Sequence, residues 1–153
     1  MNQRLAAGEG RVMGPPMMCR RRILQMAALG LASARCGPNA VQPPAIGNVL
    51  AGNASALLVG SLRAVGTEPL AIGRDAGGVY AVTLVCTHAG CLAGVDAEEI
   101  ICPCHGSRFD ANGAVLRGPA SAALDHFAVS ADPSGNLTIE TGTVVDASTR
   151  LKV

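Results

Sequence analysis

Two short motifs, each containing cysteine and histidine, constrain this chain more than any other feature. The first spans residues 86–91 (C-T-H-A-G-C) and the second spans residues 102–107 (C-P-C-H-G-S). Each follows a segment expected to be a strand, so each motif would form a loop at a strand end. Cysteines crowded around histidines indicate a metal site more than a set of disulfides. Two loops that each offer one thiolate and one imidazole can hold an object larger than a single ion.

An iron–sulfur cluster with two cysteine and two histidine ligands is one such object. Neutral imidazoles reduce the negative charge of the site, and an added electron is then easier to accept. The main alternative is a zinc ion, which also accepts two cysteines and two histidines. Zinc leaves Cys91 and Cys104 unexplained and seldom uses a Cys-x-His pair. A domain held only by disulfides would leave His88 and His105 without a role.

The pair of motifs resembles the Rieske iron–sulfur family, whose pattern C-T-H-x-G-C followed by C-P-C-H-G-S is reproduced here without a substitution. The resemblance covers roughly residues 56–141. It implies a Rieske-type [2Fe–2S] cluster as the cofactor. One iron would be bound by Cys86 and Cys102, and the other by His88 and His105.

The resemblance also implies roles for the residues around these ligands. Cys91 and Cys104 would form the disulfide that ties the two loops together in the high-potential branch of the family. Ser107 would donate a hydrogen bond to a bridging sulfide, and residues 118–120 (G-P-A) resemble the proline loop that covers the cluster. Phe109 stands where high-potential members usually have a tyrosine whose hydroxyl bonds a ligand sulfur. Loss of that donor would lower the reduction potential.

The sequence after residue 34 predicts short strands and no sustained helical period. Clear hairpin turns are expected at residues 75–78 (D-A-G-G) and 132–135 (D-P-S-G). The expected fold class is all-β, a small antiparallel β-sandwich with a cluster-binding subdomain of loops and short strands. The strands are expected at residues 56–59, 62–65, 70–73, 79–85, 99–102, 114–116, 127–130 and 137–140.

The chain has 153 residues, enough for one modest domain. We expect a signal peptide over residues 1–34, a linker over 35–55, the Rieske domain over 56–145 and a C-terminal tail over 146–153. Only three residues are aromatic, so the domain has few large anchors for a core. Small domains of this kind are usually stabilised by a metal or by disulfides.

The N-terminal segment has the order of a bacterial export signal. Three arginines at residues 20–22 precede an apolar run over residues 26–32, and residues 32–34 (A-S-A) offer a cleavage site. The run is shorter than the roughly 20 residues that span a bilayer. The arginine pair favours the twin-arginine route, with an ordinary signal peptide as the alternative. Cys36 follows Arg35 where a lipobox needs a small residue, so lipidation, cleavage and a free thiol all remain open.

These observations predict an electron-transfer protein without catalytic residues of its own, because the sequence contains no nucleophile–base pair and no mononuclear iron triad. It would pass single electrons in the periplasm, as a soluble carrier or as the small subunit of an oxidoreductase. The alternatives are a subunit of a membrane quinol–cytochrome oxidoreductase or of an arsenite-oxidase-like complex, and a zinc-stabilised binding module.

The expected partners are a redox protein donor and acceptor or a larger oxidoreductase subunit. Membrane association would come through a partner or through a lipidated Cys36. Nucleic acid is excluded, because residues 1–34 carry five arginines against one glutamate while the remaining chain is mildly acidic and poor in aromatics. The third histidine, His126, lies at the start of a predicted strand and is interpreted as structural.

Overall fold

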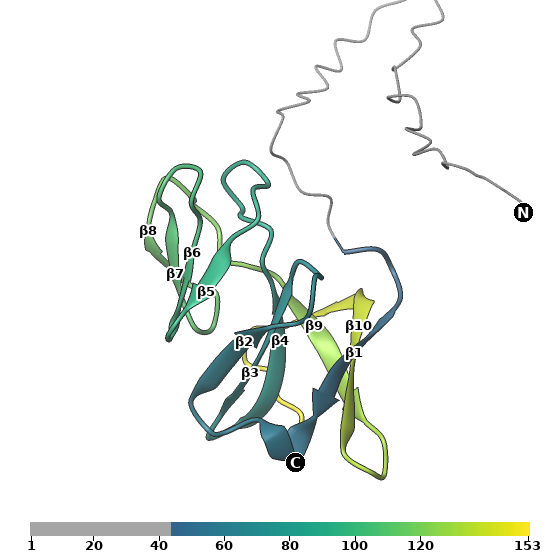
Figure 1. Cartoon of the computed structure of the whole chain (residues 1–153). Helices are drawn as coiled ribbons and strands as arrows, with labels where there is room; N and C mark the ends of the chain where they lie inside the picture. Colours follow the sequence, from purple (N-terminus) through teal and green to yellow (C-terminus); the bar gives the residue numbers. More distant parts are fainter. Residues whose placement is uncertain (1–43) are drawn as a thin grey trace, which may run out of the picture. The chain divides into compact units, whose positions relative to one another are not determined.

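The computed structural model describes residues 44–153, which form two antiparallel sheets (Figure 1). The all-β class expected from the sequence is confirmed. The predicted signal peptide and Cys36 lie outside the described residues. Within the described part, no helix has the length and apolar character needed to cross a membrane. The elements are β1 Asn48–Asn53, η1 Ala54–Ala56, β2 Ser61–Ala64, β3 Leu70–Asp75, β4 Gly78–Thr83, β5 Gly94–Asp96, β6 Glu99–Ile101, β7 Arg108–Asp110, β8 Val115–Arg117, β9 His126–Ala131 and β10 Asn136–Val145.

The larger sheet has six strands in the order β1-β10-β9-β4-β3-β2. Both hairpin turns predicted from the sequence join neighbouring strands of this sheet, 75–78 between β3 and β4 and 132–135 between β9 and β10. The Asp132 side chain accepts hydrogen bonds from the backbone N–H groups of Ser134 and Asn136, at 2.8 and 2.9 Å. Aspartate at such a position stabilises the turn locally, which is why the sequence shows it.

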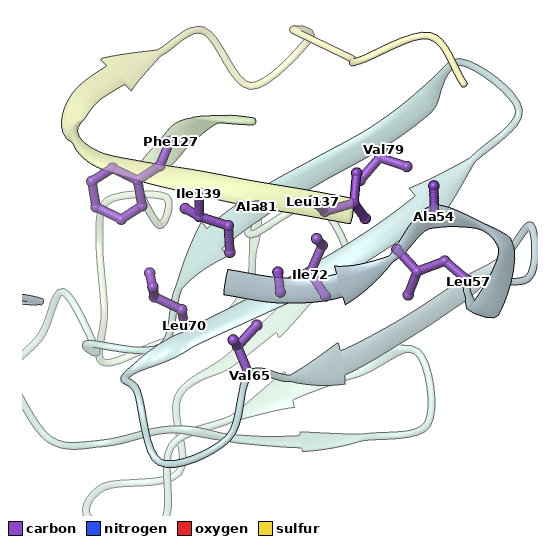
Figure 2. Close-up of a cluster of buried hydrophobic side chains, with 11 residues drawn as sticks. Ala54, Leu57, Val65, Leu70, Ile72, Val79, Ala81, Phe127, Leu137 and Ile139 are labelled. Atoms are coloured by element: carbon purple, nitrogen blue, oxygen red, sulfur yellow. The ribbon is translucent and has the colours of Figure 1, made fainter. Parts of the chain in front are cut away.

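One face of this sheet builds the first core cluster, shown in Figure 2. Leu70 and Ile72 on β3 and Ile139 on β10 are fully buried there. Alternate residues of a strand point to the same face, so the spacing of two between Leu70 and Ile72 places both in this cluster. Ala71, between them, is also fully buried, but it belongs to a second cluster on the other face. Strand β3 is therefore covered on both sides.

The second cluster lies between this other face and the smaller sheet. That sheet has four strands in the order β5-β6-β7-β8. Ile100 on β6 and Phe109 on β7 are directly opposite each other and fully buried. They share the cluster with Ala71 and Val82 of the larger sheet and with the motif cysteines other than Cys104. The smaller sheet is thus a layer with one buried face and one outer face.

The turn between β7 and β8 is anchored to the larger sheet. The Tyr80 hydroxyl donates to the carbonyl oxygen of Ala111 at 3.0 Å, and His126 Nε2 lies 2.9 Å from the carbonyl oxygen of Asn112. Arg150 donates to the Asn112 side-chain oxygen at 2.7 Å and to Asp75 at 2.7 Å. The segment after β10 therefore returns to the body and ties the two sheets together.

Several strand boundaries differ from those expected. Residues 48–53 form β1 inside the predicted linker, and residues 56–59 are not a strand, since Ala56 is the last residue of the 3-10 turn η1. Two three-residue strands, β5 and β7, were not expected, and β10 runs five residues beyond the predicted end at residue 140. Short strands show too little alternation to be recognised, and β1 is paired only with β10, far away in the sequence.

Candidate metal centre

Each of the two motif loops contains a backbone turn of the same type. In the first loop the N–H of Gly90 donates to the carbonyl oxygen of Cys86 at 2.8 Å, and the N–H of Cys86 donates to Cys91. In the second loop Gly106 donates to Cys102 at 3.0 Å in the same way, and Cys102 donates to Ser107. Both glycines have a positive φ, 71° at Gly90 and 74° at Gly106. Glycine adopts this conformation without the strain that a side chain would cause, which explains its position in each motif.

The cysteines that begin the two loops present buried thiols. Cys86 and Cys102 are free and only 2% and 1% exposed. The pKa of the Cys102 thiol lies above its ordinary value, because burial and the neighbouring Cys86 thiol raise it more than the N–H groups of Cys104 and His105 that point at its sulfur lower it. N–H groups aimed at a sulfur favour the thiolate, the form that binds a metal. The two thiols lie together on the inner side of the loops.

The two motif histidines lie on the outside of the loops. His88 and His105 are exposed, and their ring centroids are 4.8 Å apart with an edge-to-face angle of 86°. A pair of imidazoles this close can bind one ion or one side of a cluster. The structure brings the two thiols together inside and the two rings together at the surface. That all four bind one group stays a prediction from the sequence.

The remaining two motif cysteines are joined as the disulfide Cys91–Cys104, as the resemblance implied. The sulfur of Cys102 belongs to the same group, because the three sulfur atoms lie within 4.8 Å of one another. These three do not form a ligand set, since a disulfide sulfur is not a thiolate. Of the three sulfurs, Cys102 alone is free to bind metal.

A third loop closes over the motifs through two hydroxyl groups. The Ser107 oxygen, fully buried, accepts a hydrogen bond from the N–H of Ala120 at 3.0 Å. The Thr87 hydroxyl donates to the carbonyl oxygen of Ala122 at 2.6 Å. The predicted proline loop is therefore held by one residue from each motif, and its Gly118–Pro119 bond is cis. Sequence reasoning assigned no role to Thr87, although its place between Cys86 and His88 was the available signal.

Phe109 is fully buried on the inner face of β7 and cannot donate a hydrogen bond. His126 is buried on β9, and its Nε2 lies 2.9 Å from the carbonyl oxygen of Asn112. The structure therefore gives His126 a place in the joint between the sheets, in line with its interpretation as a structural residue.

The donor set fits an iron–sulfur cluster with mixed ligands. Two buried thiols and two exposed imidazoles, one of each on either motif loop, match the requirement for a group with one cysteine-bound and one histidine-bound iron. A single zinc ion would use the same donor types in a tetrahedron. The chemistry such a site supports is the transfer of one electron near the protein surface.

Comparison with known proteins agrees with this geometry. The family model described as the Rieske [2Fe-2S] domain matches residues 49–128, more than half of the chain. The curated relatives include the cytochrome b6-f complex iron-sulfur subunit of Prochlorococcus marinus (strain MIT 9211), 44% identical over 79 residues, which make up 49% of this chain and 44% of that protein. The same subunit from Cyanothece sp. (strain PCC 7425 / ATCC 29141) is 51% identical over 59 residues, or 36% of this chain and 33% of that one.

The chain spans less than half the length of these curated relatives. Among solved structures, the cyanobacterial plasma membrane Rieske protein PetC3 from Synechocystis PCC 6803 is 31% identical, with a TM-score of 0.48. The match covers 60% of this chain and 97% of that chain.

Proposed function

The chain belongs to the Rieske [2Fe–2S] domain family, and from that premise we propose that Cys86, His88, Cys102 and His105 are the cluster ligands. The cofactor is a Rieske-type [2Fe–2S] cluster, which supplies reversible one-electron chemistry when bound. The cysteine sulfurs would bind the inner iron and the imidazoles the outer one. Family membership favours this cofactor over the zinc ion considered from the sequence.

The observation that carries the proposal is the division of the site into an inner and an outer half. The thiols of Cys86 and Cys102 are almost fully buried, whereas His88 and His105 are exposed. Their rings can contact a partner at the protein surface, while the sulfurs stay out of water. The imidazole side is therefore the place where electrons would enter and leave.

Two residues would set the reduction potential. Ser107 already accepts a hydrogen bond from Ala120, so its own hydroxyl hydrogen is available for a sulfur of the bound cluster. Phe109 offers no such donor, which would lower the potential relative to relatives with a tyrosine there. Phe109→Tyr would raise the potential if the new hydroxyl reaches a ligand sulfur.

We further propose that the protein acts in the periplasm after export of a folded, cluster-loaded chain by the twin-arginine route. The arginine-rich segment and the cleavage pattern in residues 1–34 support this, with a linker after residue 34 and the cluster domain from β1 onward. It would work as a soluble carrier or as a small subunit of an oxidoreductase. The named cytochrome b6-f relatives favour a second candidate, a subunit of a membrane quinol–cytochrome oxidoreductase.

Protein-film voltammetry on the exported protein, from acid to alkaline pH, tests the function. We expect one single-electron wave at positive potential that falls as the pH rises, since iron-bound imidazoles can lose their remaining N–H protons. A pH-independent wave would contradict the histidine ligands. A colourless sample that contains zinc and gives no wave would end the proposal. A clearly negative wave would instead point to low-potential donors.

A further inference from the structure

The outer face of the smaller sheet separates its charges into two rows. The register pairs Gly94 with Ile101, Ile101 with Arg108 and Arg108 with Arg117, and residues paired across antiparallel strands share a face. This row contains both arginines of the smaller sheet. We call it the cationic row. It is also the last row before the cluster loops, because Ile101 precedes Cys102 and Arg108 follows Ser107.

The next row, two residues further from the loops, is acidic. Asp96 is paired with Glu99, and Glu99 with Asp110. Like charges directly opposite each other weaken a sheet, and here one acidic row and one basic row both contain such neighbours. The charges are alike along each row, so their sign changes with distance from the cluster loops.

The side chains of the two arginines differ in their hydrogen-bond and ion-pair partners. Arg108 donates to the Glu99 carboxylate at 2.7 Å and forms an ion pair with it. Arg117 is exposed and lies directly opposite Arg108, and its side chain makes no hydrogen bond or ion pair with any residue in the range 44–153. It is followed immediately by Gly118, the start of the proline loop. An uncompensated arginine thus lies at the edge of the cluster loops, opposite another arginine that repels it.

We propose that Arg117, with Arg108 beside it, is a docking point for an acidic protein partner in electron transfer. The inference rests on the proposed function, since it takes the cluster loops as the electron exit. Carboxylates of a partner would pair with the Arg117 guanidinium, which presents several N–H donors in a fixed geometry. Such complementary charge speeds encounter and orients the partner towards the loops that hold His88 and His105.

The charge pattern favours a protein over an anionic bilayer as the occupant. A flat negative surface that reached Arg117 would also approach the acidic row of Asp96, Glu99 and Asp110. The described part of the chain has ten acidic and six basic side chains, so a broad anionic surface would be repelled. A protein can offer a small acidic patch that covers the cationic row alone.

Two oxidants of opposite charge test the location of the positive patch. The reduced protein is mixed with ferricyanide, a trianion, or with tris(phenanthroline)cobalt(III), a trication, and loss of the reduced cluster is followed by stopped flow. At low ionic strength, we expect Arg117→Glu to slow oxidation by ferricyanide about five- to ten-fold and to speed oxidation by the cobalt complex. Both differences should disappear at high salt. Lys152→Glu is the matched control, because it makes the same charge change on the exposed C-terminal segment.

The class of partner is tested with poly-L-glutamate as the acidic polypeptide. It should compete with ferricyanide on the unmodified protein and on Lys152→Glu, and not on Arg117→Glu. Cosedimentation with phosphatidylglycerol vesicles gives the other arm of the test. Vesicle binding that depends on Arg117, without competition by poly-L-glutamate, would overturn the proposal in favour of a lipid surface.

A stability measurement checks that Arg117 is not a structural residue. Arg117→Gln should leave the unfolding midpoint unchanged or raise it, because it removes repulsion from Arg108. Equal oxidant rates for Arg117→Glu and Lys152→Glu in protein whose cluster spectrum is intact would overturn the docking point alone. Absence of the cluster spectrum in the unmodified protein would overturn the proposed function instead, so the two failures are distinguishable.

Discussion

The two sheets of this protein are stabilised in different ways. The six-stranded sheet has strands of four to ten residues and a core in which Leu70, Ile72, Leu137 and Ile139 are fully buried. The four-stranded sheet has only three-residue strands, and its single buried face is built around Ile100 and Phe109. Burial of apolar surface can hold the first sheet by itself, whereas the second needs links of another kind.

Those links converge on the loops that carry function. The Cys91–Cys104 disulfide joins the two motif loops, and the hydroxyls of Ser107 and Thr87 hold the third loop. Each link is made by a residue of the motifs themselves. The same short motifs therefore carry both the proposed ligands and the links that hold the loops in place, and the larger sheet acts as a platform.

The largest expected effect is the loss of a ligand. Cys102→Ser would remove the cluster and its absorbance, since a serine hydroxyl does not replace a thiolate at iron. Hydrogen exchange should then show lost protection at Ile100 and Phe109, while Ile72 and Ile139 in the larger sheet stay protected. Equal loss of protection in both sheets would show that they fold as one unit and would contradict the comparison.

The next effect should fall on the platform alone. Ile139→Ala removes a fully buried side chain from the first core cluster, and we expect a loss of about 2–5 kcal/mol in the free energy of unfolding. Below the melting temperature the cluster spectrum should be unchanged, because Ile139 does not contact the second cluster. Leu50→Ala is the matched control on the neighbouring strand, since Leu50 is 78% exposed and its change should cost under about 0.5 kcal/mol. Loss of the cluster spectrum in folded Ile139→Ala would show that the platform also shapes the site.

Removal of the disulfide should have a similar or smaller effect, confined to the loops. The double change Cys91→Ser and Cys104→Ser opens a link with a sequence separation of 13, for which chain entropy predicts about 3 kcal/mol. We expect faster loss of the cluster on heating and retained circular dichroism of the larger sheet. A uniform fall in the stability of both sheets would argue that the disulfide supports the whole domain.

The sequence predicted the chemistry of the site better than it predicted the strand pairing and long-range contacts around the site. The motifs contain their own turns, with glycine where a positive φ is needed, so the loops at Gly90 and Gly106 follow from local sequence. The pairing of Cys91 with Cys104 followed from the family resemblance, and the structure has it. Local patterns and short motifs carry this kind of information because the interactions lie within a few residues.

Other features could not be read from local sequence. Strand β1 lies in a stretch rich in proline, glycine and asparagine, and its pairing with β10 joins residues about ninety positions apart. The opposition of Arg108 and Arg117 depends on the register of two three-residue strands that show no alternation. The return of Arg150 to the joint between the sheets is likewise a long-range contact.

That joint provides the smallest and most selective test, which concerns pH. Burial raises the pKa of Asp75, but the hydrogen bond from Arg150 and those from the N–H groups of Gly77 and Gly78 outweigh it, so the pKa lies below its ordinary value of 3.8. A carboxyl whose pKa is lowered on folding contributes stability above its unfolded pKa and loses that contribution as pH falls through the folded value. The Asp75 side chain is 42% exposed, so solvent screening keeps the effect modest.

Asp75→Asn should therefore have a lower urea midpoint than the unmodified protein at pH 7. When the pH is lowered below about 4, the midpoint of the variant should fall by less than that of the unmodified protein. Asp96→Asn is the control, since it removes an exposed carboxylate that lies opposite Glu99 in the smaller sheet and should not lower the urea midpoint at pH 7. Because Arg150 holds both Asp75 and Asn112, release of one contact should loosen the other. Hydrogen exchange at Gly113, in the β7–β8 turn, should then increase in Asp75→Asn. Unchanged exchange there would show that the two sheets are joined by apolar packing alone, with Arg150 contributing only to the larger sheet.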